Sequence, residues 1–163
     1  MRKSVPSEPA AAFAAVPAAA RGCTNLKLRQ LTRRVSQHYD RIVAASGLKT
    51  TQYSLLSLIV RLGPVRPGEL ARAMEMDPST LTRNLQPLAS HGWIEVGPGS
   101  DGRSRVVVAT ASGRAARDAA QREWKRAQLA LNRRLGEVRV AELHALLDAC
   151  LEQLADSAEA EGG

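Results

Sequence analysis

Apolar residues recur at intervals of three and four along most of this chain, a spacing that predicts a mainly helical protein. A first long helix is expected from Thr24 or Asn25, either of which can cap it, to about residue 46, where Gly47 ends it. The apolar positions of this helix fall on one stripe: Leu28, Leu31, Val35, Tyr39 and Ile42. The stripe predicts one buried and one solvated face.

Three shorter helices are predicted in the middle of the chain. The first starts at Thr50 or Thr51 and extends to about residue 62, and the others span 67–74 and 78–90. Pro67 and Pro78 stand in first turns, where the missing N–H is harmless, and Asp77 is expected to cap the third helix. Pro87 removes one backbone hydrogen bond near its end and predicts a kink. The inward residues of that helix are Leu81, Leu85 and Leu88.

A β-hairpin is predicted next. Two short β-type runs, 93–96 and 105–109, flank a cluster of Gly, Pro, Ser and Asp that turns the chain. Val65 and Arg66 are expected to add a one-bridge strand to it. The tip reads DGRSR (101–105) and places two arginines on a ribbon with little apolar cover. Two short helices followed by a basic hairpin form a winged helix-turn-helix, a DNA-binding arrangement.

Two further helices, 111–135 and 138–158, follow Thr110, which is expected to cap the first of them. The last helix carries an apolar stripe, widened by two further leucines: Val140, Leu143, Leu146, Leu147, Cys150, Leu151 and Leu154. Cys150 is expected to be a core residue there. The stripe is wider than one terminal helix needs, which favours a partner subunit, and packing on the protein's own first helix is the alternative.

The charge is uneven along the 163 residues. The whole chain carries +7, but the segment from Glu137 onward holds seven acidic residues and one basic residue, which makes −6 and leaves +13 on the rest. A basic body favours a polyanionic partner, and an acidic end indicates a part that does not face nucleic acid. Aromatic residues make up 3%, so the core must consist of Leu, Val, Ile and Ala.

Several classes of protein are disfavoured. Two distant cysteines and three scattered histidines make no disulfide framework or metal set, and no Gly-rich phosphate loop or Ser–His–Asp pattern points to an enzyme. No metal or cofactor is predicted. No apolar run approaches the roughly 20 residues of a membrane span, and prolines interrupt the Ala-rich start, so a cytoplasmic protein with a flexible tail over 1–22 is expected.

The motifs resemble those of one family. The run DGRSRVVVATASG (101–113) is similar to the wing signature of the MarR (multiple antibiotic resistance regulator) family, and GELA (68–71) and LTRNL (81–85) resemble its helix-turn-helix. The resemblance implies a mainly α fold with a small hairpin wing, built as an obligate dimer through the first and last helices. It divides a domain at 23–158 into dimerisation segments, 23–48 and 111–158, and a winged helix-turn-helix, 50–110, with a tail at 159–163.

The same resemblance implies a homodimeric transcriptional regulator, a repressor, on a pseudo-palindromic duplex operator. Helix 78–90 would enter the major groove with Ser79, Thr80, Thr82, Arg83 and Gln86. Arginine suits guanine and glutamine suits adenine, which agrees with these roles. Arg103 would reach the minor groove from the wing tip, Arg105 is a further DNA-binding candidate of the wing, and Asp101 would brace the wing. A helical interaction protein without DNA binding is the distant alternative.

Two kinds of sensor are open. Family members release DNA when a small aromatic acid or phenol binds, and the candidate pocket residues are His38, Tyr39, Tyr53 and Trp124, each of which also suits the core. Arg33 and Arg41 are candidate carboxylate anchors or a solvated face. A redox branch of the family carries a reactive cysteine near the start of the first helix, which makes Cys23 the alternative sensor, although Asn25 aligns with that cysteine.

Overall fold

The computed structural model describes residues 22–99, 102 and 104–160, with side chains up to residue 155. These residues fall into two units, one ending at Val35 and one from Ser36 on, and each is described by itself. The first unit holds most of helix α1 (Thr24–Val43). Its leucines, Leu26, Leu28 and Leu31, are exposed. The predicted tail lies almost entirely outside the described residues.

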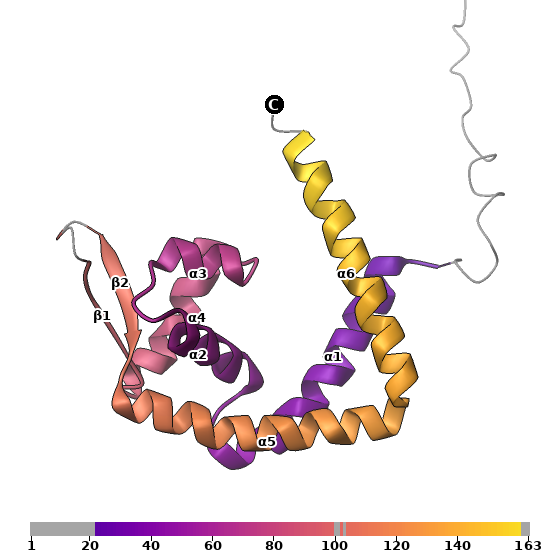
Figure 1. Cartoon of the computed structure of the whole chain (residues 1–163), viewed down its shortest axis with the longest axis horizontal. Helices are drawn as coiled ribbons and strands as arrows, with labels where there is room; N and C mark the ends of the chain where they lie inside the picture. Colours follow the sequence, from indigo (N-terminus) through magenta and orange to yellow (C-terminus); the bar gives the residue numbers. More distant parts are fainter. Residues whose placement is uncertain (1–21, 100–101, 103, 161–163) are drawn as a thin grey trace, which may run out of the picture. The chain divides into compact units, whose positions relative to one another are not determined.

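The second unit contains the end of α1 and all the remaining elements (Figure 1). In chain order these are a 3-10 turn η2 (Ala44–Ser46), α2 (Thr50–Leu62), α3 (Pro67–Ala73), α4 (Pro78–Ser90), β1 (Ile94–Pro98), β2 (Arg105–Ala109), α5 (Ala111–Leu135) and α6 (Glu137–Ala160). The predicted helices are all present, but the first ends as an α-helix at Val43, three residues before its predicted end, and continues as the 3-10 turn; the other boundaries agree within two residues. None of the described helices is long and apolar enough to cross a lipid bilayer.

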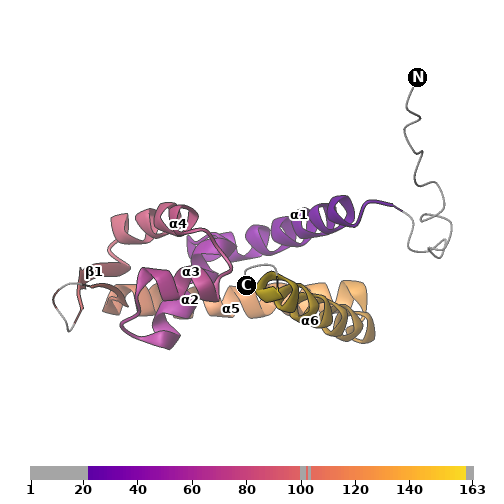
Figure 2. The ribbon, with the colours of Figure 1, turned by 90° about the horizontal axis from the view of Figure 1, so that it is seen from above.

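The core of this unit lies where α2 meets its neighbours. Helix α2 packs against both α4 and α5, and the three helices lie close together in Figure 2. Its Leu55, Leu56 and Ile59 are almost completely buried, together with Leu70 of α3 and Val107 of β2. The predicted apolar faces therefore meet in one cluster of mostly aliphatic side chains.

The hairpin is antiparallel and runs two residues further into the Gly/Pro cluster than predicted. Ile94 pairs with Ala109 at one end, and Pro98 pairs with Arg105 at the other. Val65 forms the predicted single bridge to Val107 and exchanges both backbone hydrogen bonds with it, at 3.1 and 2.8 Å. This bridge ties the segment between α2 and α3 to the hairpin, so the wing is not an isolated ribbon.

Two predicted helix caps are wrong. Asp77 occupies the capping position of α4, but its side chain makes no capping hydrogen bond. At α1, Thr24 is already helical, and Cys23 precedes the helix and accepts the N–H of Leu26 on its sulfur at 3.4 Å. The cap of α5 is confirmed, because the Thr110 hydroxyl accepts the N–H of Gly113 at 3.0 Å. Capping depends on the side-chain rotamer, which residue type alone does not set.

The prediction that Cys150 is a core residue is also wrong. Among the α6 residues up to 155, only Val140 is buried, Leu143 and Leu147 are half-buried, and Cys150 is exposed. No described segment of the second unit covers the rest of the predicted stripe: Leu146, Leu151 and Leu154 are 63%, 50% and 69% exposed. An apolar stripe on a terminal helix predicts burial, but it does not say by which chain.

Candidate nucleic-acid interface

Helix α4 presents one apolar and one polar face. Leu81, Leu85 and Leu88 are 1%, 8% and 0% exposed and anchor the helix to the core. The five residues predicted to contact DNA are all exposed: Ser79, Thr80, Thr82, Arg83 and Gln86. Leucines spaced by three and four residues leave the intervening positions on the opposite side of the helix, so the polar face follows directly from the sequence.

The hydrogen bonds within α4 divide these polar residues into two kinds. The hydroxyl of Thr82 donates to the carbonyl of Pro78 at 2.9 Å, so its proton is engaged within the helix. The side chains of Ser79, Thr80, Arg83 and Gln86 make no hydrogen bond or ion pair to other described residues. Four polar side chains on one exposed helix face therefore keep their donors and acceptors for an external partner.

The hairpin carries a second basic position beside α4. Arg105 is exposed at the start of β2, where it pairs with Pro98 across the hairpin. The turn is closed by backbone bonds from Gly99 to Ser104 at 2.7 Å and from Gly102 to Gly99 at 2.9 Å, with Gly102 at φ +67°. Asp101 and Arg103, the other predicted wing residues, lie outside the described residues.

Hydrogen bonds and one close backbone contact hold the segment between α4 and the hairpin against the start of α5. The hydroxyls of Thr110 and Ser112 donate to the carbonyl of Gly92 at 2.7 and 3.0 Å, and the N–H of Thr110 donates to the carbonyl of Trp93 at 3.0 Å. Gly113 lies so close to Trp93 that a Cβ on it would come within 1.9 Å of the Trp93 oxygen. This junction therefore holds α4 and the hairpin against the start of α5.

The four predicted effector residues lie close together, and their rings pack against one another. Trp124 of α5 lies between Tyr39 and Tyr53, with ring centroids 6.2 and 6.0 Å away. The Tyr39 hydroxyl donates to the side-chain oxygen of Gln128, and the His38 ring is 2.9 Å from the carbonyl of Ala127. Burial raises the pKa of Tyr39 above its usual value. Tyr53 also lines a cavity.

That cavity has a volume of about 500 Å³ and lies between α2, the end of α3 and the first half of α5. Its polar lining includes Tyr53, Ser57, Arg61, Arg117 and Gln121. Arg61, Arg117 and Gln121 were not predicted as site residues. Their signal was present in the sequence as polar positions at helical spacing, but the spacing did not say that the polar edges of α2 and α5 face one another.

Cys23 lies just before α1, as predicted, and it is exposed. Its sulfur accepts the N–H of Leu26. This N–H is one of the first backbone donors of the helix, which have no acceptor within the helix itself. The candidate carboxylate anchors Arg33 and Arg41 are both exposed.

The structural features agree with comparisons to known proteins. A family model described as the MarR family matches residues 46–104. The *M. tuberculosis* transcriptional regulator MosR, solved in complex with DNA, is 34% identical, with a TM-score of 0.65, over 79% of this chain and 98% of that one. The chain belongs to the MarR family.

Two curated transcriptional regulators also match this chain. The multiple antibiotic resistance protein MarR of *Salmonella typhimurium* is 31% identical over 87 residues, which are 51% of this chain and 60% of that protein. An uncharacterized HTH-type transcriptional regulator of *Bacillus subtilis*, YwoH, is 26% identical over 52% of this chain and 61% of its own length. The matched part thus spans about three-fifths of these curated relatives.

A mutant MarR from *E. coli*, solved with operator DNA, shares the fold of this MarR-family chain. Its TM-score is 0.72 at 23% identity, over 78% of this chain and 92% of that one. The predicted winged helix-turn-helix fold is confirmed.

Proposed function

We propose that this MarR-family protein is a transcriptional repressor that binds a pseudo-palindromic duplex operator as a homodimer. The observation that carries the proposal is the exposed polar face of α4, whose Ser79, Thr80, Arg83 and Gln86 have no partner among the described residues. The relatives solved with DNA are MosR and MarR, and their DNA complexes support the same partner here.

The chemistry of α4 suits base reading in a major groove. Arg83 can donate two hydrogen bonds to guanine O6 and N7, and Gln86 can pair with adenine N6 and N7. Thr82 keeps its methyl group and an acceptor lone pair, because its proton is engaged by Pro78. Ser79 and Thr80, in the first turn of the helix, are suited to phosphate oxygens.

The wing would contact the adjacent minor groove. Arg105 is exposed next to the turn of the hairpin, and Arg103 at its tip remains a prediction for minor-groove insertion, where narrow A·T-rich segments concentrate negative potential. Asp101 remains the predicted brace of the wing. Two arginines on one hairpin add favourable phosphate attraction to the contacts of α4.

A homodimer is supported by apolar surface left open on the terminal helices. Leu26 of α1 and Val138 of α6 are 55% and 74% exposed, in addition to the uncovered leucines of the α6 stripe. Large apolar side chains exposed on a helix in this way are typical of a protein–protein interface. Each helix carries such residues, which agrees with the family's dimerisation through its first and last helices.

Operator release by a small aromatic or phenolic effector is the regulation that the aromatic cluster and the adjacent cavity support. The alternative is release on oxidation of Cys23, which is favoured by its exposed place at a helix N-terminus. A Cys23→Ser protein that still releases DNA on peroxide treatment would exclude the redox route.

Duplex binding is tested by fluorescence anisotropy with DNA from upstream of the protein's own gene. Arg83→Ala should weaken operator binding by ~1–3 kcal/mol and relax preference at one base pair. Arg103→Ala should weaken binding while the protein remains dimeric. The matched control is Arg122→Ala, an exposed arginine of α5 outside the α4 face and the hairpin, which should change little.

Salt dependence separates DNA binding from the distant alternative. Each phosphate neutralised adds roughly 0.9 to the slope of log K against log salt on duplex DNA. A protein whose affinity for duplex stays flat across salt, or that ignores its own promoter DNA, would be a helical interaction protein and not a DNA-binding regulator.

A further inference from the structure

We infer that Trp124 is a positioning residue: its indole is a wedge that sets the angle between α2 and α5, and with it the separation of the operator half-sites that the proposed dimer accepts. The inference rests on the proposed function, because it names what determines the spacing that such a dimer reads. It gives Trp124 a task inside the protein in place of the predicted contact with an effector.

The side of α5 that packs inward carries small side chains with one exception. The buried or half-buried residues along it, spaced by three and four, are Gly113, Ala116, Ala120, Trp124 and Ala127. Glycine and alanine let a neighbouring helix approach closely, and the distance between the axes of packed helices varies over about 8–10 Å with the side chains at the contact. Trp124 is therefore the residue of this stripe that holds α5 away from its neighbours.

The ring of Trp124 contacts one aromatic ring on each of two other helices. Its centroid is 6.2 Å from that of Tyr39, near the end of α1, and 6.0 Å from that of Tyr53, on α2, with interplanar angles of 34° and 31°. These separations are typical of favourable aromatic pairs. Both tyrosines are 8% exposed, so the rings fill the space between the three helices. Because close-packed side chains leave few voids, the thickness of the indole sets how near α2 can come to α5.

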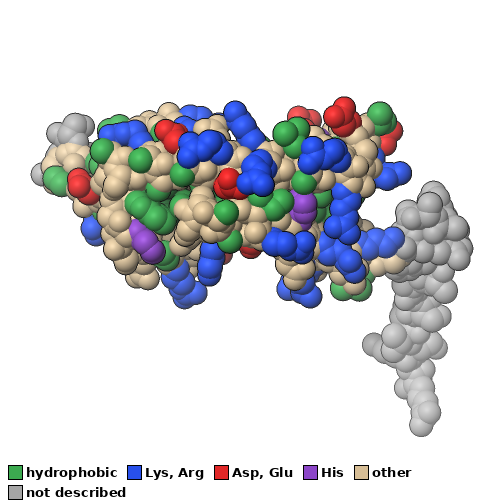
Figure 3. Space-filling view, turned by 90° about the horizontal axis from the view of Figure 1, so that it is seen from below, with side chains coloured by type: hydrophobic (Ala, Val, Ile, Leu, Met, Phe, Trp, Pro, Cys, Tyr) green, Lys and Arg blue, Asp and Glu red, His purple; other side chains and the backbone are tan. Residues whose placement is uncertain are grey.

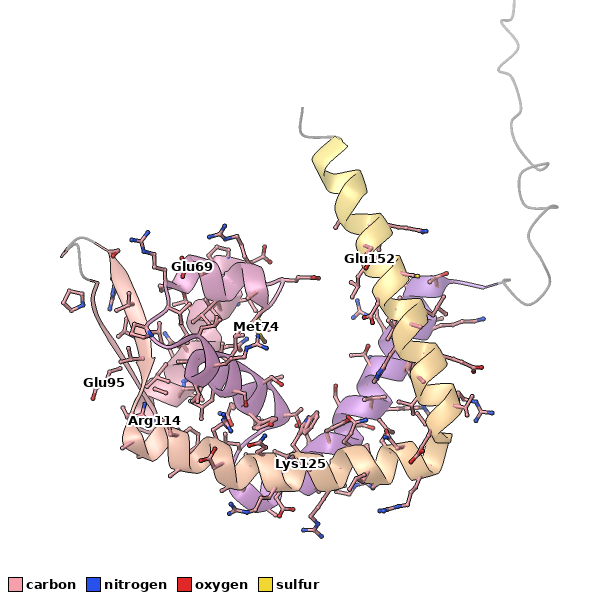
Figure 4. The ribbon with its side chains drawn as sticks, in the orientation of Figure 1. Glu69, Met74, Glu95, Arg114, Lys125 and Glu152 are labelled. Atoms are coloured by element: carbon pink, nitrogen blue, oxygen red, sulfur yellow. The ribbon has the colours of Figure 1, made fainter. Side chains whose placement is uncertain are left out.

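The reading lobe, which we define as α2, α3, α4 and the hairpin, is held on α5 at two places. One is the junction at the start of α5, where Gly113 packs against the backbone of Trp93. The other is Trp124, eleven residues later, which is about 16 Å along the helix. Figure 4 shows α2 alongside the part of α5 between Arg114 and Lys125, the labelled neighbours of these two places. The lobe can therefore turn about the junction when the wedge changes in size.

The end of α1 is tied to α5 by hydrogen bonds beside the wedge. The Tyr39 hydroxyl donates to the side-chain oxygen of Gln128, and the His38 ring is 2.9 Å from the carbonyl of Ala127. These bonds do not involve the indole, so they keep the end of α1 on α5 when Trp124 is replaced. The displacement should therefore fall on α2 and the reading lobe.

A change in the wedge would reach the predicted DNA contacts of α4. Replacing the indole by a methyl group can bring α2 and α5 closer by up to ~2 Å, which turns the reading lobe by ~7° over an arm of about 16 Å. Helix α4 has 13 residues, about 20 Å, ends beside the junction, and carries Ser79 and Thr80 at its far end. That end would move by ~2 Å in each protomer, so the two ends change their separation by up to ~4 Å, more than the ~3.4 Å rise of one base pair.

The outer side of α5 provides the matched control. Helix α5 runs along the bottom of Figure 1, and Figure 3, which looks from below, shows many Lys and Arg side chains on this side. Arg122 and Lys125 are exposed, and Leu129 is 56% exposed. Leu129→Ala therefore removes a large apolar side chain from the same helix without touching the wedge.

The angle of the lobe is measured within one chain, without DNA, by double electron–electron resonance. Spin labels are attached to Asp77→Cys, before the far end of α4, and to Arg133→Cys, near the end of α5, because both positions are exposed. The protein's own two cysteines are replaced by serine, and the labelled chain is diluted with unlabelled protein. Trp124→Ala should shift the mean distance between the labels by ~2 Å, as worked out above. Trp124→Leu should shift it less, and Leu129→Ala should give the wild-type distance.

Half-site spacing is measured by fluorescence anisotropy on the duplex that footprinting delimits upstream of the protein's own gene, and on versions with one base pair added or removed between its half-sites. The wild type should prefer the native spacing by about 10-fold. In Trp124→Ala this ratio should fall by about 5-fold, while the slope of log K against log salt, which reports phosphate contacts, stays the same. A variant that is only less stable would lose affinity equally on all three duplexes and keep the ratio.

The wild-type label distance in both Trp124→Ala and Trp124→Leu would overturn the positioning role, and the leucine variant keeps this test decisive if the alanine variant does not fold. An unchanged spacing ratio in a variant whose label distance shifts, or an equal effect of Leu129→Ala, would also overturn the inference. A wild-type protein that ignores duplex DNA or stays monomeric would refute the proposed function, while the label distance would still decide whether Trp124 sets the angle of the lobe.

Discussion

The close approach of Gly113 to Trp93 gives the sharpest test of the structure. Gly113 is the third residue of α5, and a Cβ added there would lie 1.9 Å from the Trp93 carbonyl oxygen and 2.8 Å from its carbonyl carbon. Both atoms belong to the backbone, so they cannot rotate away as a side chain can. In Gly113→Ala, α5 and the turn between α4 and β1 must therefore move apart by more than 1 Å.

Two effects make this movement unfavourable, and one partly offsets them. Overpacking costs ~1–3 kcal/mol, and separation of the two segments also lengthens the 3.0 Å hydrogen bond from the Thr110 N–H to the Trp93 carbonyl, worth ~1 kcal/mol. Alanine offsets this by up to ~1 kcal/mol, because it is the better helix former. Gly113→Ala should therefore lower the free energy of unfolding by about 2 kcal/mol.

The assay is urea unfolding followed by circular dichroism, at one fixed protomer concentration, because the stability of the proposed dimer would depend on that concentration. The matched control is Gly68→Ala in α3, where a Cβ meets nothing within 4 Å and the stability should stay unchanged or rise. Equal stability of Gly113→Ala and the wild type, or an equal loss in both variants, would refute the reasoning.

Three further predictions concern other contacts. Tyr39→Phe removes the hydroxyl that donates to Gln128 and should cost about 1 kcal/mol in urea unfolding at pH 7. Burial raises the pKa of Tyr39 above 10.0, so the unfolded chain loses this proton at a lower pH than the folded protein does. The wild type should therefore lose stability as the pH rises above 10.0, more steeply than Tyr39→Phe does in the same assay. Thr110→Val removes the cap of α5 and should lower the unfolding free energy by ~1–2 kcal/mol; an unchanged urea midpoint would contradict this role. Leu151→Glu places a charge on the open face of α6 and should shift sedimentation from dimer to monomer, whereas a dimer of unchanged affinity would remove α6 from the interface.

The elements of this protein follow from local sequence. Leucines spaced by three and four residues determine both that 78–90 is a helix and which side of it is polar, because a helix turns every 3.6 residues. Proline in first turns and the Gly-rich cluster between β-type runs place the ends of the elements in the same way. The candidate DNA-contacting residues of α4 were therefore predictable as an exposed group before any fold was known.

Only the tertiary structure decided which residues that are distant in the chain contact one another. Ser57 and Arg117 are sixty residues apart, and nothing in the periodicity of either helix says that they border one cavity. The same holds for Gly113, whose missing side chain reflects the position of Trp93, and for Cys150, which lies on the part of the α6 apolar stripe that no described segment of its own unit covers. Periodicity specifies which face of an element is apolar, but the partner of that face depends on how the chain packs, and that is a property of all the elements together.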